Sequence, residues 1–381
     1  MEEKDIMASE DYWLTESIFG IPVVRETFQR VRTDAALPLS WRGTIPIPQG
    51  YALEKLLGTG SFGTVVLLRK QDDPAASPLA LKILAKDILA QTYRDRLPED
   101  SCGMSKENLF HFFFKFIIFF FMVKTDFTQE EHEYADRPVE LALREAIAFS
   151  AAALSERGRQ HVVILQGMFE DPTHLGFGME FMEGGCLNPR NHAEYGVHLL
   201  SIGKQIFEGL AYLHDPGNFQ NKECIVHRDI KAENILIRWP NGPDHPPVVK
   251  LADFGLSRPV RTSGTQPTVV GTETTMAPEL EEPELWSPGK VTMQEKARMD
   301  VWSAGIVFLQ LIMHNPNIST KVIYFKADPF IPKPDCETLQ SFLSIDCKLS
   351  PAAVNFFTGT FQVRPIERFS AADCVSHPYL S

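Results

Sequence analysis

Short apolar stretches separated by polar turns run through the first half of the chain and predict strands. Tyr51–Leu57 and Thr64–Arg69 are joined by a glycine-rich turn, and Leu79–Leu84 follows as a third strand. Residues 139–154 have a helical period instead, with Glu145 among the residues on one face. Further short strands complete a small antiparallel sheet: Val162–Leu165, Phe169–Glu170 and Leu175–Phe181.

The chain after Gly184 and Gly185 becomes mainly helical. Leu199–His214 predicts an amphipathic helix, another helix is expected around Asp300–Met313, and Pro365–Tyr379 closes the domain. Residues 1–48 contain scattered aromatic residues and prolines without a sustained period, which indicates an N-terminal extension. A flap packed on the first sheet and a flexible leader both fit this pattern.

The region of about residues 88–137 fits neither period. Its centre, Leu109–Val123, contains eight phenylalanines in fifteen residues. A membrane-spanning helix needs about 20 mostly apolar residues. This run is shorter and carries Lys115 near its middle, so no membrane span is expected. Two interpretations stay open: a translated intron, because a pyrimidine-rich splice tract encodes runs of phenylalanine, or a family-specific insertion that docks a partner.

Composition narrows the class of protein. The 381 residues are 44% hydrophobic and 23% charged, as in an ordinary globular protein. A formal net charge of −12 argues against nucleic-acid partners, which require a basic surface. The six cysteines are scattered, without the spacing of a zinc site or a disulfide framework, and Met1–Asp5 begins no secretory signal. We therefore expect a cytoplasmic or nuclear protein. The sequence does not indicate its oligomeric state.

The glycine-rich turn spans Gly58–Val65 and has the spacing G-x-G-x-x-G-x-V. Glycines let the backbone approach a ligand closely, so that N–H groups can face phosphate oxygens. The same glycine spacing occurs in dinucleotide-binding turns, which open a helix. Here Thr64–Arg69 predicts a strand, which disfavours the dinucleotide interpretation.

Three further segments follow in a fixed order. Lys82 lies in the next apolar strand, His227–Asn234 has the sequence HRDIKAEN, and Asp253–Gly255 has the sequence DFG. Asp229 and Asp253 are 24 residues apart. With Ala277–Glu279 (APE) closing the set, these segments resemble those of the eukaryotic protein kinases, and the resemblance runs from about Gln49 to the C-terminus.

The resemblance implies an α+β fold of two lobes with the active cleft between them. The kinase domain would occupy residues 49–381, after the extension of residues 1–48. Its N-lobe, about 49–182, would be a small antiparallel sheet interrupted by the atypical insertion, and its C-lobe, about 183–381, mainly helical.

The resemblance also implies roles in catalysis. Asp229 would accept or orient the proton of the substrate hydroxyl, and Lys231 would neutralise the transferring phosphoryl group. Asn234 and Asp253 would bind Mg²⁺. Lys82 would contact the nucleotide phosphates, paired with Glu145. We prefer Glu145 to Glu140 because Phe149, one turn on, can pack inward, whereas Arg144 cannot easily do so.

The cofactors implied are ATP and Mg²⁺. The adenine would contact the backbone of Glu180–Met182, with Met179 at the back of its pocket. The residues expected to bind the nucleotide are Gly58, Thr59, Gly60, Ser61, Phe62, Gly63, Val65, Ala80, Lys82, Met179, Glu180, Met182, Asn234 and Asp253.

The expected function is that of a serine/threonine protein kinase, which transfers the γ-phosphate of MgATP to protein hydroxyls. Lys231, two positions after Asp229, and Gly271-Thr272 ahead of Ala277–Glu279 are typical of the serine/threonine class. Thr275 is a departure, because the family usually has an aromatic residue there. The alternative is a catalytically impaired kinase-fold scaffold, since the insertion lies between the Lys82 strand and the Glu145 helix and leaves Lys82 and Glu145 63 positions apart.

Further expectations concern substrate, regulation and support of the large lobe. Glu233 and the overall acidity favour substrates with basic flanks. Thr268 is the candidate for activating phosphorylation. Glu279 should pair with Arg368, and Asp300 should anchor the catalytic segment from below.

Overall fold

The computed structural model divides the chain into two compact units. The first comprises residues 1–146 and 164–181, and the second comprises residues 147–163 and 182–381. The residues that the structure describes are 17–18, 21–33, 43–60, 63–85, 155–191, 195–219, 223–254, 256–260, 267, 269–324 and 336–381. The helix expected over 139–154 and the insertion over 88–137 lie outside them.

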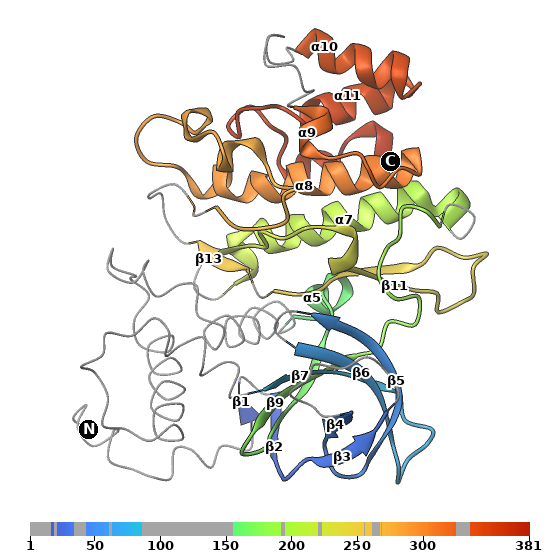
Figure 1. The fold of residues 1–381 in the computed structure, drawn as a ribbon. Coiled ribbons are helices and arrows are strands. Elements are labelled where there is room, and N and C mark those ends of the chain that lie inside the picture. The colour runs from blue at the N-terminus through green and yellow to red at the C-terminus, as the bar shows by residue number, and fades with distance from the viewer. Residues whose placement is uncertain are drawn as a thin grey trace. The chain divides into compact units, whose positions relative to one another are not determined.

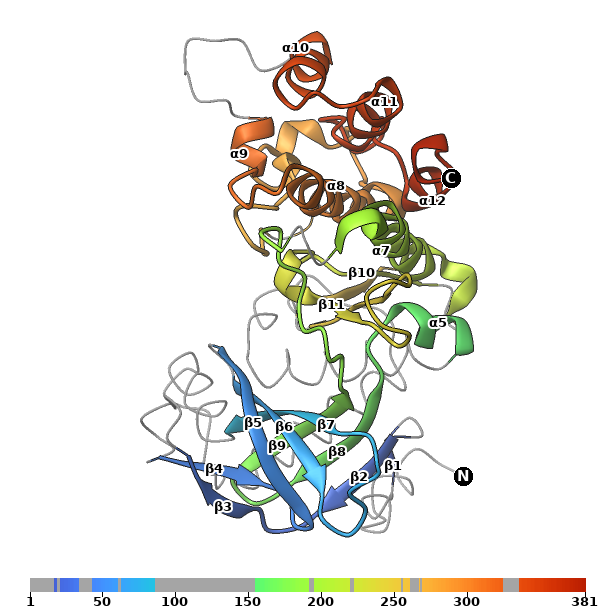
Figure 2. The ribbon, with the colours of Figure 1, turned by 90° about the vertical axis from the view of Figure 1, so that its right-hand side faces the viewer.

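A seven-stranded sheet and a separate two-stranded hairpin form the described part of the first unit (Figures 1 and 2). Neighbouring strands are antiparallel except β2 and β8, which run parallel. The strands expected over Tyr51–Leu57, Thr64–Arg69, Leu79–Leu84 and Leu175–Phe181 are confirmed. The strand expected over Val162–Leu165 is wrong, because only Leu165 belongs to a strand and Val162 forms an isolated bridge to Leu251; Phe169–Glu170 is the end of the longer strand Leu165–Glu170. In order across the sheet the strands are β1 (Ser17–Ile18), β2 (Ile21–Arg25), β8 (Leu165–Glu170), β9 (His174–Glu180), β7 (Leu79–Ala85), β6 (Gly63–Lys70) and β5 (Tyr51–Gly60).

The two faces of this sheet differ in chemistry. Successive residues of a strand point to opposite faces. Val66 and Leu81 are opposite each other in β6 and β7, and both are buried in the hydrophobic core of the unit. Val65 and Lys82 are the next pair along, and therefore lie on the other face together with Ala80. One face thus serves folding, and the other carries the residues expected to bind phosphate.

Residues from the N-terminal extension cover the apolar face. A hairpin of β3 (Gln29–Arg32) and β4 (Thr44–Ile47) places Ile45 and Ile47 in the core at 0% exposure, next to the buried Phe28. The described part of the extension is therefore packed against the sheet. Its strands are at most five residues long and one contains Pro46, which explains why no period is visible in the sequence.

Asp171 ties this N-terminal segment to the turn between β8 and β9. Its side chain, in a residue only 7% exposed, accepts hydrogen bonds from the backbone N–H groups of Phe28, Thr173 and His174. Burial alone raises the pKa of Asp171, but these bonds within the turn outweigh burial and hold the pKa below its ordinary value.

We expect Asp171→Asn to lower the free energy of unfolding by about 1–3 kcal/mol at pH 7, because an amide is a weaker acceptor for these donors. The folded-state pKa is depressed, so the stabilisation is present above the unfolded pKa and is lost as pH falls through the folded value. The difference should therefore shrink below about pH 4. Urea unfolding at pH 7 and in acid measures it, with Asp72→Asn in an exposed ion pair as control. Equal stabilities at pH 7 would refute this role.

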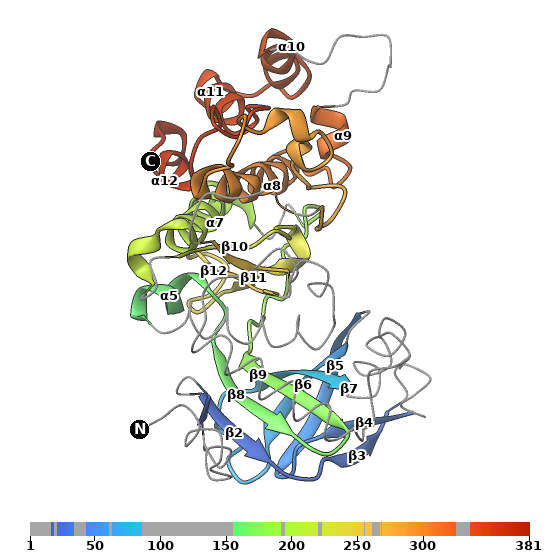
Figure 3. The same ribbon diagram turned by 90° about the vertical axis from the view of Figure 1, so that its left-hand side faces the viewer.

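The second unit is built around two long helices that pack against each other, α7 (Leu199–His214) and α8 (Met293–Met313) (Figure 3). The bounds of α7 agree with the prediction, whereas α8 begins before the expected Asp300. Aromatic rings from α7, α8 and α11 meet edge to face in the core, including Phe207 and Phe356 at 5.4 Å. The other α-helices among the described residues of this unit are α5 (Glu156–His161), α9 (Thr320–Ile323), α10 (Cys336–Ser341), α11 (Pro351–Thr360) and α12 (Ala371–Val375).

Two short strand pairs complete this unit. The pair β10 (Cys224–Val226) and β13 (Arg258–Val260) and the pair β11 (Ile235–Arg238) and β12 (Val248–Leu251) are both antiparallel. Within the part of the chain that the structure describes, no helix is long and apolar enough to cross a membrane.

Candidate active site

The catalytic segment lies between strands β10 and β11 and is fixed from below by Asp300 of α8. The Asp300 carboxylate accepts hydrogen bonds from His227 N at 2.7 Å and from Arg228 N at 2.8 Å. His214 of α7 also contacts this carboxylate, at 2.8 Å from Nε2. The anchoring role expected for Asp300 is confirmed. Arg228 has a φ of 71°, a conformation that a non-glycine residue adopts only when its surroundings enforce it.

The Asp229 carboxylate contacts the side chains of Thr272, Lys231 and Asn234. Its Oδ1 atom accepts from the Thr272 hydroxyl at 2.6 Å, and its Oδ2 atom lies 2.8 Å from Lys231 Nζ. Lys231 Nζ also donates to Thr272 Oγ1 at 3.1 Å. A carboxylate, an ammonium and a hydroxyl thus meet within hydrogen-bond distance. This is the geometry needed to receive a hydroxyl proton beside a positive charge.

Asn234 is oriented by the same carboxylate. Its Nδ2 group donates to the backbone oxygen and to Oδ2 of Asp229, at 2.8 and 3.0 Å. The amide oxygen is thereby directed away from Asp229, as a metal ligand would be. Strand β12 leads directly to Asp253, which has a φ of 58°, and Ala252 N donates to the Asn234 backbone oxygen at 2.8 Å. A backbone hydrogen bond at Ala252, the residue before Asp253, therefore holds the two candidate metal ligands, Asn234 and Asp253, close together in the fold.

This donor set fits Mg²⁺. Among the described residues, no group of three or more His, Cys, Asp and Glu side chains could hold a metal. A magnesium site needs fewer protein ligands, because the ion keeps water and phosphate oxygens alongside one or two carboxylates.

Phe254 and Gly271 close the catalytic segment on two sides. The Phe254 ring is fully buried and lies 4.9 Å from the His227 ring, centroid to centroid. Gly271 has a φ of 123°, and a Cβ atom there would lie 2.6 Å from the backbone oxygen of Arg228. Only glycine fits this close approach just before Thr272.

The glycine-rich turn and Lys82 belong to the first unit. Gly58 pairs with Val65 and Gly60 with Gly63 across strands β5 and β6. A Cβ atom at Gly63 would lie 2.5 Å from the backbone oxygen of Ile83, so strand β7 requires glycine at this position. Gly63 therefore serves the packing of the sheet as well as any ligand, whereas a Cβ atom at Gly58 would meet nothing within 4 Å.

The expected adenine contacts divide between the two units. Ala80 is opposite Met179 in the register of β7 and β9, so both share the face that carries Lys82. The Glu180 side chain accepts a hydrogen bond from Ile164 N at 2.8 Å. Met182, in the second unit, is buried. The remaining expected residues lie outside the described ones: Ser61, Phe62, Glu145, Gly255 and Thr268.

Cys224 lies three residues before His227 in the sequence, and its thiol stays protonated at neutral pH. Burial, reinforced by the Asp300 carboxylate, raises the pKa of Cys224 in β10 to about 12. A nucleophilic cysteine would need a lowered pKa. The site therefore offers a carboxylate, a lysine and an amide for chemistry, and Cys224 serves the packing of β10.

The family model described as "Protein kinase domain" matches residues 123–380, which is more than half of the chain. The chain belongs to the protein kinase family. The match begins at the end of the phenylalanine-rich run, so the glycine-rich turn and Lys82 precede it. Both the recognition as a kinase and the expected α+β fold, with sheets toward the N-terminus and helices toward the C-terminus, are confirmed.

Curated relatives of this kinase include serine/threonine-protein kinases of fungi and calcium/calmodulin-dependent protein kinases of animals. PakA of Talaromyces marneffei is 31% identical over 212 residues, which cover 53% of this chain and 28% of that protein. Shk1/pak1 of Schizosaccharomyces pombe is 28% identical over 248 residues, 62% of this chain and 32% of that protein. Calcium/calmodulin-dependent protein kinase type IV of Homo sapiens is 36% identical over 151 residues, 39% and 28%. The matched part thus spans less than a third of the length of each relative.

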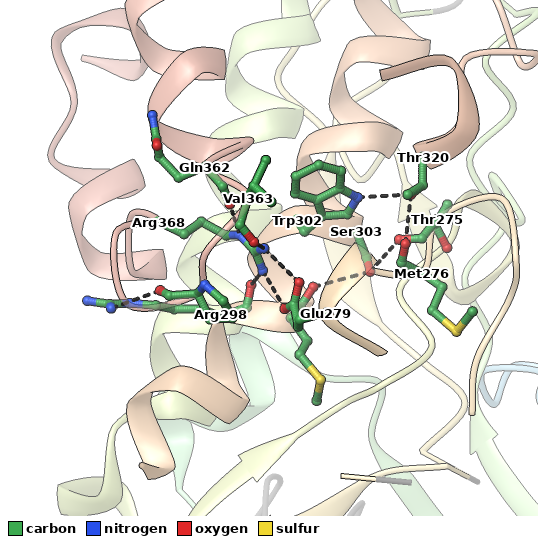
Figure 4. A network of polar contacts seen from close by, with 12 residues as sticks. Thr275, Met276, Glu279, Arg298, Trp302, Ser303, Thr320, Gln362, Val363 and Arg368 are labelled. Carbon is green, nitrogen blue, oxygen red and sulfur yellow. Dashed lines mark hydrogen bonds and ion pairs between the residues drawn. The ribbon is translucent and has the colours of Figure 1, made fainter. Parts of the chain in front are cut away.

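The kinase also has the expected buried pair between Glu279 and Arg368. Arg368 donates from both terminal nitrogens to the two carboxylate oxygens, at 2.7 and 2.8 Å, and both side chains are fully buried (Figure 4). The Arg368 guanidinium also lies over the Trp302 ring, 5.0 Å from its centroid. The prediction of this pair from the sequence is confirmed.

Two contacts of the kinase have no local signature in the sequence. Thr272 appeared only as a marker of the serine/threonine class, although its hydroxyl contacts both Asp229 and Lys231. Thr320 gave no signal, although it bonds the backbone of the segment that follows Thr272. Both contacts join residues more than 40 positions apart.

Proposed function

We propose that this chain is a serine/threonine protein kinase that transfers the γ-phosphate of MgATP to hydroxyls of protein substrates. The family membership supports phosphoryl transfer, and the names of the matched relatives support the serine/threonine class. The catalytic roles of the individual residues are part of this proposal.

The observation that carries the proposal is the hydroxyl held between Asp229 and Lys231. Thr272 Oγ1 donates to the Asp229 carboxylate at 2.6 Å and accepts from Lys231 Nζ at 3.1 Å. A substrate hydroxyl presented to the same carboxylate would lose its proton to Asp229. Its oxygen would form a bond to the γ-phosphorus as the bond to the β–γ bridging oxygen breaks, with ADP as the leaving group.

The proposed nucleotide and metal ligands fall into two sets. In the first unit, Gly58–Val65 and Lys82 would face the phosphates, with Ala80 and Met179 beside the adenine. In the second unit, Asn234 and Asp253 would hold Mg²⁺. When bound, this ion would neutralise charge that develops on the phosphate oxygens. Positioning and charge neutralisation supply most of the rate enhancement in this reaction class.

Two finer features of the function rest on charge and thiol chemistry. Glu233 is exposed two residues after Lys231, and the chain carries a formal charge of −12, which supports substrates with basic residues flanking the target hydroxyl. Cys186, Cys224, Cys347 and Cys374 are free thiols, which suits a reducing compartment such as the cytoplasm or nucleus.

A peptide library with a single acceptor tests this proposal. The full chain is incubated with labelled ATP and peptides that contain serine, threonine or tyrosine as the only hydroxyl, with basic or acidic flanks. Label in the serine and threonine peptides, abolished by EDTA and strongest with basic flanks, is the expected result. Label confined to tyrosine peptides would overturn the proposed class, and equal labelling of both flank types would overturn the flank preference.

A further inference from the structure

The backbone carbonyls of Thr274, Thr275 and Met276 accept hydrogen bonds from donors elsewhere in the second unit. These residues belong to the stretch 272–279, which ends in the Ala-Pro-Glu motif and is called the docking segment below. The bonds are Thr320 N to Thr274 O at 2.8 Å, Ser303 Oγ to Thr275 O at 2.7 Å and Thr320 Oγ1 to Met276 O at 2.7 Å. Figure 4 shows the Ser303 and Thr320 side chains converging on the backbone of Thr275 and Met276.

Thr320 is itself held in place from two sides. Its hydroxyl accepts a hydrogen bond from Trp302 Nε1 at 2.9 Å while it donates to Met276 O. Its backbone begins helix α9, which is capped by Ser319. Thr320 is 4% exposed and Trp302 is fully buried, so water cannot readily replace these bonds. The hydroxyl therefore links the rigid core of α8 to the docking segment.

The other end of the docking segment touches the proposed catalytic group. Thr272 bonds Asp229, and within the segment Thr275 N and Met276 N both donate to Thr272 O, at 3.0 and 2.9 Å. If the Thr274 and Met276 carbonyls that bond Thr320 moved, Thr272 would move with them, because one turn of hydrogen-bonded backbone connects these residues.

We propose that Thr320, together with Ser303, is a positioning residue for protein substrate. This proposal rests on the proposed function, and it adds a residue outside the motifs of the active site. The hydrogen bonds from Thr320 and Ser303 to the docking segment, called the clasp below, hold this segment in the position in which Thr272 contacts Asp229. A peptide bound along the segment then presents its hydroxyl to the Asp229 carboxylate. Nucleotide binding does not depend on the clasp.

The variant Thr320→Val removes the hydroxyl and keeps the shape of the side chain. It leaves Trp302 Nε1 and Met276 O without their partner, and we expect kcat/KM for a serine peptide to fall by about tenfold, mainly through a higher peptide KM. The affinity for MgATP, measured by nucleotide titration, should stay within about twofold of the wild type. Thr320→Ser keeps donor and acceptor and should restore the peptide KM.

A second variant and a second readout keep the test decisive. Ser303→Ala removes one bond of the clasp and should raise the peptide KM by a smaller factor, so it decides the question if Thr320→Val does not fold. Hydrogen exchange at Thr275 N and Met276 N should accelerate in Thr320→Val while the amides of α7 stay protected. This readout does not need activity, so it separates failure of the clasp from failure of the proposed function.

Two results would overturn the proposal. One is an unchanged peptide KM and unchanged exchange in folded Thr320→Val or, where that variant does not fold, in Ser303→Ala. The other is an equal loss of peptide and nucleotide affinity that Thr320→Ser does not restore, since that would indicate a role in the stability of the whole unit.

Discussion

The variant Asp229→Asn is expected to lose phosphoryl transfer by about a thousandfold in kcat while retaining affinity for MgATP. An amide in place of the carboxylate cannot accept the hydroxyl proton. It also removes the negative charge that Lys231 Nζ contacts at 2.8 Å and that the Thr272 hydroxyl meets at 2.6 Å. Asn234 can keep its hydrogen bond to the Asp229 backbone oxygen in this variant, so we expect the loss mainly in the chemical step.

The measurement is single-turnover transfer of labelled phosphate to a serine peptide, together with nucleotide titration. Asp244→Asn is the matched control, because it makes the same chemical change at an exposed aspartate in the loop between β11 and β12. Transfer by Asp229→Asn within about tenfold of the wild type would remove Asp229 from the role of proton acceptor.

The second large effect concerns stability. Removing the Arg368 side chain by Arg368→Ala leaves the Glu279 carboxylate buried without its counter-charge, which costs about 3–5 kcal/mol. The variant also loses the bonds from Arg368 to the backbone oxygens of Gln362, Arg298 and Val363. A fall of about 10 °C in Tm is expected for a unit of this size.

Differential scanning calorimetry checks this prediction, and Arg364→Ala serves as its control. Arg364 pairs with Glu367 at 3.5 Å in the same segment, but both side chains are about half exposed. Such pairs are worth about 0–1 kcal/mol. Similar Tm values for the two variants would show that the buried pair does not hold the second unit together.

The elements that the sequence predicted well are those with a strong period or a distinctive residue order. The α7 helix was predicted at its observed bounds because apolar residues recur along one face throughout it. The residues expected at the catalytic segment were found within hydrogen-bond distance of one another, because the motif spacing places Asp229, Lys231 and Asn234 on one short loop.

The start of α8 was missed although a local signal was present. The helix begins with the polar stretch Met293–Arg298, which shows no apolar face, so the prediction began at Asp300. Thr292 and Glu295 form a capping box at its N-terminus, with the Glu295 carboxylate accepting from Thr292 N at 2.9 Å. The Thr-x-x-Glu pattern would have located the helix start correctly.

The packing of the N-terminal extension and the contacts of Thr320 lay beyond sequence reasoning. Strands as short as β3 and β4 carry too few residues to establish a period. Thr320 contacts Met276 across 44 positions, and nothing about a single threonine at the start of a one-turn helix predicts such a contact. Long-range hydrogen bonds of this kind depend on the tertiary fold, which local patterns do not encode.

Phosphate transfer from labelled MgATP to a serine peptide with basic flanks, measured on the full chain and on a chain lacking residues 88–137, tests the central claim most directly. Magnesium-dependent transfer to serine by at least one of the two chains, abolished in each active chain by Asp229→Asn, is the predicted result. Activity of the shortened chain alone would identify the phenylalanine-rich segment as foreign to the folded enzyme. Absence of transfer by both chains, with folding and nucleotide binding intact, would contradict the claim and favour a kinase-fold scaffold.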